Sequence, residues 1–330
     1  MSAMRRSRAA AAIAALLLLS GCASTGAQLD QAAGDARAAV TGAALALDIA
    51  PDTVPPGVLS TALDDAMREV VDATNRVLEL PATGRHRAQR LAPELLVGSI
   101  ALRETGGFLL ATNHGLFLYD PDTGEAPRPL LNPEPDQPDN RLNDGKCDRR
   151  GRFWVGSMPD TRRTPEGRLY RLDPDHRCHV MLDDVVLPNS IAWSPDDRTM
   201  YFADTHRQVI WAFDYDLDDG AISNRRVFKD WTHQAGRPDG STVDVDGCLW
   251  NAMVATGQLV RLTPEGRVDR IIQMPVTNPT CPAFGGSGLD TLYVTSHSQR
   301  IPELAREPLA GGLFALDVGV GGLPEPRFRG

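Results

Sequence analysis

The fold of this chain is decided by a glycine turn that leads into an apolar strand, Gly151-Arg152-Phe153-Trp154. A Gly or Asp turn followed by such a strand occurs five times, with gaps of 45, 46, 50 and 43 residues, and the copies begin at Gly106, Gly151, Asp197, Gly247 and Asp290. A second unit, an alternating strand that ends in an acidic or glycine turn, occurs six times, and its copies begin near residues 77, 116, 168, 209, 258 and 312. Repeats of 40–50 residues that each hold several short strands are typical of a β-propeller. We therefore predict an all-β, six-bladed propeller over residues 52–330, because a β-sandwich would not explain the regular period.

The bulk composition fits one large soluble domain. The chain has 330 residues, of which 42% are hydrophobic, and its formal net charge is −9. No basic run suggests a phosphate-binding surface, so nucleic acid is excluded as a partner. Since no linker interrupts the repeats, we expect a single folded unit and a monomer.

The N-terminus is typical of an exported protein. Arg5, Arg6 and Arg8 precede an apolar run that ends at Leu19, and Ser20-Gly21-Cys22 follows. This is the pattern of a secretory signal rather than of a membrane span. Its end resembles a bacterial lipobox, which implies a signal peptide over residues 1–21, lipidation of Cys22 and an Ala-rich tether over residues 22–51. An ordinary cleaved signal and a misassigned start codon are the alternatives.

This interpretation places the protein in the cell envelope. Residue 23 is alanine rather than the aspartate expected of a lipoprotein retained at the inner membrane, so we expect the periplasmic side of the outer membrane, with the lipid as the only membrane contact. The remaining cysteines, Cys147, Cys178, Cys248 and Cys281, are widely spaced without a CxxC pair. They indicate neither a metal cluster nor a redox motif, and we expect most of them in buried strands.

Polar residues recur at one place in the repeat. The run Arg141-Leu142-Asn143-Asp144-Gly145-Lys146 precedes one apolar strand, and Asn189 and Asp239 occupy the place of Asp144 in the next two copies. The repeat therefore predicts each of these three residues directly before the innermost strand of its blade. In a propeller the innermost strand of each blade lines the central channel, so these side chains are expected to converge on one face. Carboxylate and amide oxygens there would suit one divalent cation. The alternative is three Asx turns that satisfy their own backbone.

At these residues the chain resembles the SMP-30/gluconolactonase/luciferin-regenerating family. The matching elements are Arg141-Leu142-Asn143-Asp144-Gly145-Lys146, Pro188-Asn189-Ser190, Gly236-Arg237-Pro238-Asp239-Gly240 and Thr280-Cys281-Pro282-Ala283-Phe284-Gly285-Gly286. The resemblance implies a six-bladed propeller that binds one Ca²⁺ or Zn²⁺ and hydrolyses a sugar lactone.

The resemblance also implies roles for individual residues. Asn189 and Asp239 would be metal ligands, and Arg141 and Asn143 would hold the substrate. Asp239 is also our candidate for the base that activates water. Asp144 would support the loop, and Asp160 is a weaker candidate for contacting a substrate hydroxyl.

The first blade departs from the family pattern. There the family has a third metal ligand, a glutamate, whereas this chain reads Val54-Pro55-Pro56-Gly57-Val58-Leu59, and its nearest acids are Asp52, Asp64 and Asp65. Three explanations stay open. One of these aspartates replaces the glutamate as metal ligand, or the protein has lost catalysis and kept a sugar-binding channel, or the N-terminal segment has a divergent sequence.

Three functions therefore stay open. The leading hypothesis is a metal-dependent aldonolactone hydrolase. The alternatives are a catalytically impaired, lipid-anchored sugar-binding propeller and a hydrolase of another ester or an organophosphate. A serine hydrolase is disfavoured, because no Gly-x-Ser-x-Gly elbow is present.

Overall fold

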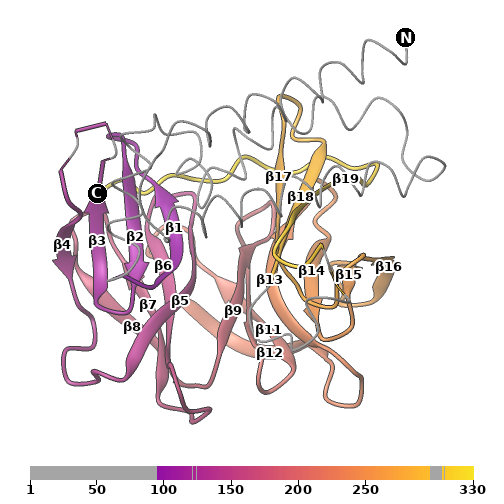
Figure 1. The fold of residues 1–330 in the computed structure, drawn as a ribbon, viewed down its shortest axis with the longest axis horizontal. Coiled ribbons are helices and arrows are strands. Elements are labelled where there is room, and N and C mark those ends of the chain that lie inside the picture. Colours follow the sequence, from indigo (N-terminus) through magenta and orange to yellow (C-terminus); the bar gives the residue numbers. More distant parts are fainter. Residues whose placement is uncertain (1–94, 121, 124, 298–306, 308) are drawn as a thin grey trace, which may run out of the picture.

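The described chain forms antiparallel sheets arranged around a central axis (Figure 1). A computed structural model describes residues 95–120, 122–123, 125–297, 307 and 309–330. Four sheets have four strands each. The first contains β1 (Val97–Leu102), β2 (Phe108–Thr112), β3 (Gly115–Tyr119) and β4 (Arg128–Leu131), and the second contains β5 (Asn140–Cys147), β6 (Phe153–Pro159), β7 (Gly167–Leu172) and β8 (Cys178–Val185). The third contains β9 (Pro188–Trp193), β10 (Thr199–Asp204), β11 (Val209–Tyr215) and β12 (Ile222–Asp230), and the fourth contains β13 (Arg237–Val243), β14 (Leu249–Val254), β15 (Gln258–Leu262) and β16 (Val268–Gln273). The fifth contains β17 (Pro279–Gly285), β18 (Thr291–Ser296) and β19 (Leu313–Asp317).

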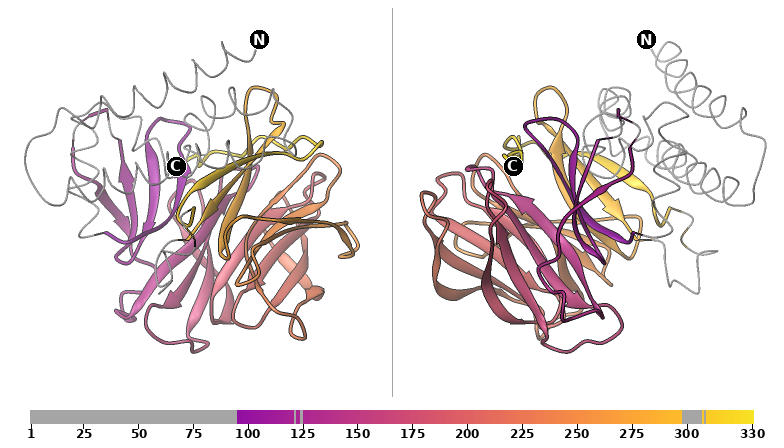
Figure 2. Two further views of the ribbon diagram at one scale, coloured as in Figure 1. Left: turned by 45° about the vertical axis from the view of Figure 1, so that its right-hand side comes forward. Right: turned by 90° about the vertical axis from the view of Figure 1, so that its left-hand side faces the viewer.

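These five sheets are blades of a β-propeller, which confirms the predicted fold class. In each blade the strands follow one another in chain order, and the first strands β1, β5, β9, β13 and β17 lie side by side around the axis (Figures 1 and 2). The five turn-strand copies correspond to β2, β6, β10, β14 and β18. The predicted first blade, the signal peptide, Cys22 and the tether lie outside the described residues. Within the part of the chain that is described, no helix is long and apolar enough to cross a membrane.

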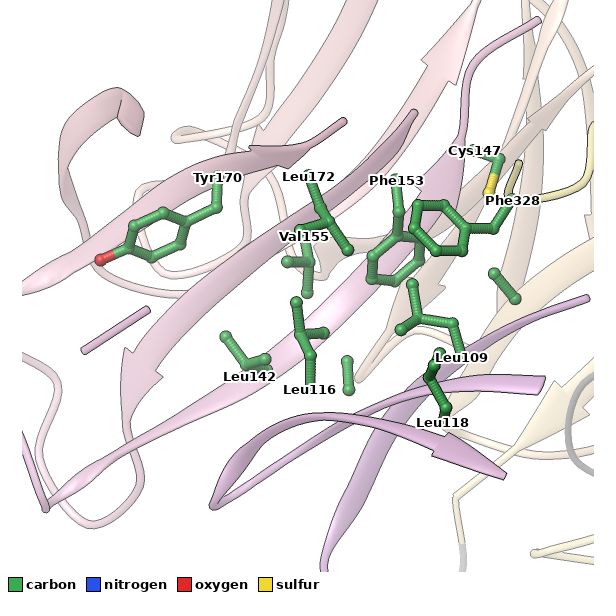
Figure 3. Close-up of a cluster of buried hydrophobic side chains, with 12 residues drawn as sticks. Leu109, Leu116, Leu118, Leu142, Cys147, Phe153, Val155, Tyr170, Leu172 and Phe328 are labelled. Carbon is green, nitrogen blue, oxygen red and sulfur yellow. The ribbon is translucent and has the colours of Figure 1, made fainter. Parts of the chain in front are cut away.

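The core lies between neighbouring blades. Leu109 and Leu116 of the first described blade pack with Phe153 and Leu172 of the next, and all four are fully buried (Figure 3). Phe328, near the C-terminus, joins the same cluster. Each blade is apolar on both faces, so packing blade on blade removes both faces from water, which is the main favourable contribution to folding.

Two blades carry the same buried polar network. The Asp148 carboxylate accepts hydrogen bonds from Trp154 Nε1 at 2.9 Å and Arg152 Nε at 2.6 Å. In the blade of β13–β16, the Asp244 carboxylate accepts from Trp250 Nε1 at 2.9 Å and from Arg261 Nε at 2.8 Å. In both blades the acid precedes the tryptophan by six residues, so the sequence period is repeated in three dimensions. Buried carboxylates need such partners, because an unpaired buried charge is strongly destabilising.

Candidate active site in the channel

The inner strands all carry a register irregularity. The pairing of β1 with β2 shifts between Val97 and Ser99, and the shifts in β5, β13 and β17 fall at 142–145, 238–241 and 279–282. In the blade of β9 the shift falls opposite residues 189–192. Bulges locally disrupt the ladder and re-aim side chains, and they are common beside active sites.

The bulges correct one expectation from the sequence. Asp144, Asn189 and Asp239 do not precede the inner strands but lie inside β5, β9 and β13. Strands β5, β9 and β13 begin several residues earlier than the repeat predicts. A bulge interrupts the in–out alternation of side chains without ending the strand, so the strand includes these residues.

Arg141, Asn143 and Asn189 form one hydrogen-bonded chain. Asn143 Nδ2 donates to Asn189 Oδ1 at 3.1 Å and to the Pro188 carbonyl at 2.9 Å, so β5 is tied to β9. Arg141 Nη1 donates to Asn143 Oδ1 at 2.7 Å, and Arg141 Nε donates to Asp160 at 2.7 Å. These contacts connect the two predicted substrate-binding residues with one predicted metal ligand.

The chain of hydrogen bonds continues from the blade of β9–β12 into the blade of β13–β16. Asn189 is buried, and its Nδ2 donates to Thr205 Oγ1 at 2.7 Å, while Thr205 Oγ1 donates to the Pro238 carbonyl at 2.5 Å. Ser190, which has a positive φ of 57°, donates its hydroxyl to the Asp239 carbonyl. A non-glycine residue in this conformation is uncommon and indicates a locally fixed backbone. Asn189 and Asp239 are therefore held relative to each other.

Two carboxyl groups share the channel. Burial raises the pKa of Asp239 to about 8, and the nearby charge of Asp144 adds to the shift. Burial also raises the pKa of Asp144, whose carboxylate accepts a hydrogen bond from the Ile191 amide at 3.2 Å. Two like charges in a poorly solvated place favour protonation or a bound cation.

These donors fit part of a divalent-cation site. Asn189 Oδ1 and the Asp239 carboxyl are hard oxygen donors of the kind that Ca²⁺ accepts and Zn²⁺ tolerates. Within residues 95–330 as far as they are described, no three His, Cys, Asp or Glu side chains gather as a metal site. The segment in which the family has its glutamate lies outside the described residues, so a third protein ligand is not assigned.

Sequence reasoning missed the residues that connect the predicted ones. Thr205 lies in the turn after β10, and Asn251 on β14 donates to the hydroxyls of Ser190 at 3.0 Å and Ser241 at 2.9 Å. A small polar residue at a turn or a strand centre is common in any β-protein, so only the blade-to-blade contacts single these residues out. Cys147 and Cys248 are buried, Cys178 is partly buried and Cys281 is exposed, so two of these four cysteines rather than most of them are buried. All four are free.

The sequence of this chain is similar to that of known proteins. Residues 70–298 match the SMP-30/Gluconolactonase/LRE-like region. The 6-deoxy-6-sulfogluconolactonase of Pseudomonas putida is 39% identical over 253 residues, which are 76% of this chain and 86% of that protein. Regucalcin of Xenopus laevis is 33% identical over 253 residues, covering 74% of this chain and 84% of regucalcin.

A solved structure agrees with the sequence comparison. The crystal structure of regucalcin from Agrobacterium tumefaciens, described as a calcium-binding protein, aligns with a TM-score of 0.68 at 32% identity. The alignment covers 72% of this chain and 80% of that one. Fold and channel thus define a β-propeller with a polar site built from its inner strands. The chain belongs to the SMP-30/gluconolactonase/LRE family.

Proposed function

We propose that the protein is a metal-dependent lactonase that opens a sugar lactone to the sugar acid. The observation that carries this proposal is the hydrogen-bonded chain from Arg141 through Asn143 to Asn189, which Thr205 connects to β13 just before Asp239. The similarity to a sulfogluconolactonase supports the same reaction class.

The side chains divide the work of hydrolysis. Arg141 and Asn143, which lie two residues apart on β5, bind the lactone through its hydroxyls and carbonyl oxygen. In the ligand-free protein the Asn143 amide donates to Pro188 and Asn189, so the lactone replaces one of these contacts when it binds. The Asp239 carboxylate accepts a proton from the attacking water, and that proton passes to the ring oxygen as the acyl C–O bond breaks. A cation held by Asn189 and Asp239 would supply polarisation of the lactone carbonyl.

The substrate is proposed to be an aldonolactone. Because the Pseudomonas putida relative is named for a 6-sulfonated gluconolactone, that compound belongs in the test beside glucono-, galactono- and xylono-lactone. Arg141 already pairs with Asp160, so it recognises the neutral part of a substrate rather than offering a free charge.

Ring opening with and without EDTA tests the proposal. We expect a rate above background on at least one lactone, restored by Ca²⁺ or Zn²⁺ after chelation. Asp239→Asn should lower kcat by about 10²–10⁴-fold. Asp290→Asn provides a matched control, since Asp290 lies in the turn before β18 rather than at the bulges. No metal-dependent turnover on any of the four lactones would refute the proposal.

A sugar-binding propeller without turnover is the second candidate. It is motivated by the sequence Val54-Pro55-Pro56-Gly57-Val58-Leu59, which has no glutamate where the family has its third metal ligand. It predicts that a lactone or sugar acid raises Tm without product forming, and turnover abolished by Asp239→Asn would eliminate it. Hydrolysis of another ester or an organophosphate is tested in the same assay with those substrates.

The wider setting of the enzyme is also a proposal. The lipobox-like Ser20-Gly21-Cys22 supports lipid anchoring at Cys22 on the periplasmic side of the outer membrane, after removal of a signal peptide over residues 1–21. That the protein is a monomer is a separate proposal, which the mass of the purified protein in solution tests. The first of the six copies of the alternating strand, near residue 77, supports a divergent first blade within the propeller domain, residues 52–330. Mass spectrometry of the membrane fraction tests the anchor, and it should find a diacylated N-terminal cysteine.

A further inference from the structure

The last residues of the chain form a strap, residues 321–330, that crosses the ring. At one end the Val245 amide donates to the Gly321 carbonyl at 3.0 Å, and the Gly322 amide donates to the Leu289 carbonyl at 2.7 Å. The strap therefore starts on the blades of β13–β16 and β17–β19. Figure 1 shows it as the yellow chain that runs from there to the blade of β1–β4.

The other end of the strap is fixed by backbone pairing and by burial. The Phe328 amide donates to the Leu102 carbonyl at 2.8 Å, and the Arg329 amide donates to the Gly151 carbonyl at 3.1 Å. The Phe328 ring is fully buried against Phe153 (Figure 3). With both ends attached to different blades, the middle of the strap has a defined position.

The middle of the strap carries a charge into the channel. Glu325 Oε1 lies 3.0 Å from Lys146 Nζ, and Lys146 Nζ also donates to the Ser241 carbonyl at 3.2 Å. Lys146 belongs to β5 and Ser241 to β13, so the lysine reaches past the intervening blade of β9. Leu323, Pro324, Glu325 and Pro326 line a small hollow with Lys146 and Thr242.

This ion pair lies below the site residues. Lys146 follows Asp144 by two residues in β5, and Ser241, whose carbonyl accepts from Lys146, follows Asp239 by two residues in β13. Burial raises the pKa of Asp144 most strongly, while the Lys146 charge lowers it and the Glu325 charge raises it. The strap thus acts electrostatically on the Asp144 carboxyl.

We propose that the C-terminal strap is the floor of the active-site channel and that Glu325 is a positioning residue, which holds the Lys146 ammonium beneath Asp144 and so sets the channel's affinity for a divalent cation. The part that concerns the cation rests on the proposed function. In this proposal neither residue touches substrate. Both act on the charge of Asp144, which in turn acts on Asp239.

The test compares the two partners of the pair. Ca²⁺ and Zn²⁺ affinities are measured by calorimetry for the wild type, Glu325→Gln, Lys146→Met and the double variant. Glu325→Gln removes a negative charge and should weaken binding about tenfold, whereas Lys146→Met removes a positive charge and should tighten it by a similar factor. The double variant should return close to the wild type. If the pair were only a structural link, both single variants would change affinity in the same direction, which would overturn the proposal.

A matched control lies in the same strap. Arg329 Nε contacts Glu104 Oε1 at 2.8 Å outside the channel, so Glu104→Gln breaks a strap ion pair without changing the field at the site. It should leave metal affinity unchanged. A loss of affinity as large as that of Glu325→Gln would show that strap attachment, rather than charge, is responsible.

A metal-free readout separates this inference from the proposed function. Cys281 is exposed as a residue, but burial of its thiol raises the pKa to about 12. The charges of Asp144, Asp239 and Glu325 also raise this pKa, whereas Lys146 lowers it. With EDTA present at fixed pH, iodoacetamide should modify Cys281 several-fold faster in Glu325→Gln and several-fold slower in Lys146→Met. Alkylation rates that are the same in the wild type and in both variants would refute the proposed role of the strap. If the two variants shift the rate in opposite directions but the wild type binds no metal, the role of the strap is retained and the metal-dependent lactonase is refuted.

Discussion

Replacing Asp239 by asparagine tests the electrostatics of the channel directly. Burial and the charge of Asp144 raise the pKa of Asp239 from 3.8 to about 8. Between these values the folded, metal-free protein keeps a proton that the unfolded chain has lost. The free energy of unfolding must therefore fall as pH rises from about 4 to about 8, and be independent of this group below and above that window.

The size of the effect follows from the same shift. At about 1.36 kcal/mol for each pH unit, the loss across the window is at most about 6 kcal/mol. For a domain of this size that corresponds to roughly 10–20 °C in Tm. An asparagine side chain cannot titrate, so Asp239→Asn should remove the part of the decline that Asp239 causes and leave a contribution of the same sign from Asp144, whose pKa is also raised.

Urea unfolding in EDTA at intervals between about pH 5 and pH 8.5 measures how the free energy of unfolding changes with pH in the wild type and in Asp239→Asn. Asp214→Asn is the control, because the pKa of Asp214 is lowered by Asn224 and Arg226 and both states are ionised across this range. Parallel pH profiles for the wild type and Asp239→Asn would show that Asp239 is not the buried acid described above.

Four further outcomes are expected. Ca²⁺ or Zn²⁺ should raise Tm more at about pH 8 than at about pH 5, because the cation competes with the proton on Asp239, and thermal melts at both pH values check this. Asn143→Ala should lower kcat/KM by about 100-fold, since it releases Arg141, with urea unfolding showing that the fold is retained. Asp148→Ala should cost about 3–5 kcal/mol of unfolding free energy by leaving buried Arg152 unpaired. Gly98→Ala should cost about 2–3 kcal/mol, because its Cβ would lie 2.3 Å from a carbonyl oxygen of β5; an unchanged urea midpoint would contradict the described packing of β1 on β5.

The sequence by itself determined the propeller and most of the candidate site. A period of about 45 residues is a local property, set by where turns interrupt apolar alternation, so it predicted β2, β6, β10, β14 and β18 without any long-range contact. Asn189 and Asp239 were found because the repeats superimpose, whereas Arg141 and Asn143 became candidates because the run that contains them resembles the family motif. Their roles remain proposals, and the first blade lies outside the described residues.

The tertiary structure alone decided how those residues act on one another. No local pattern predicts the bulges, since they depend on two paired strands failing to stay in register. Nor does it predict that Thr205 connects Asn189 to β13, or that Glu325 meets Lys146 across 179 residues. Contacts between blades form only when the ring brings distant segments together, and the pKa of Asp239 depends on the burial and neighbouring charge that result.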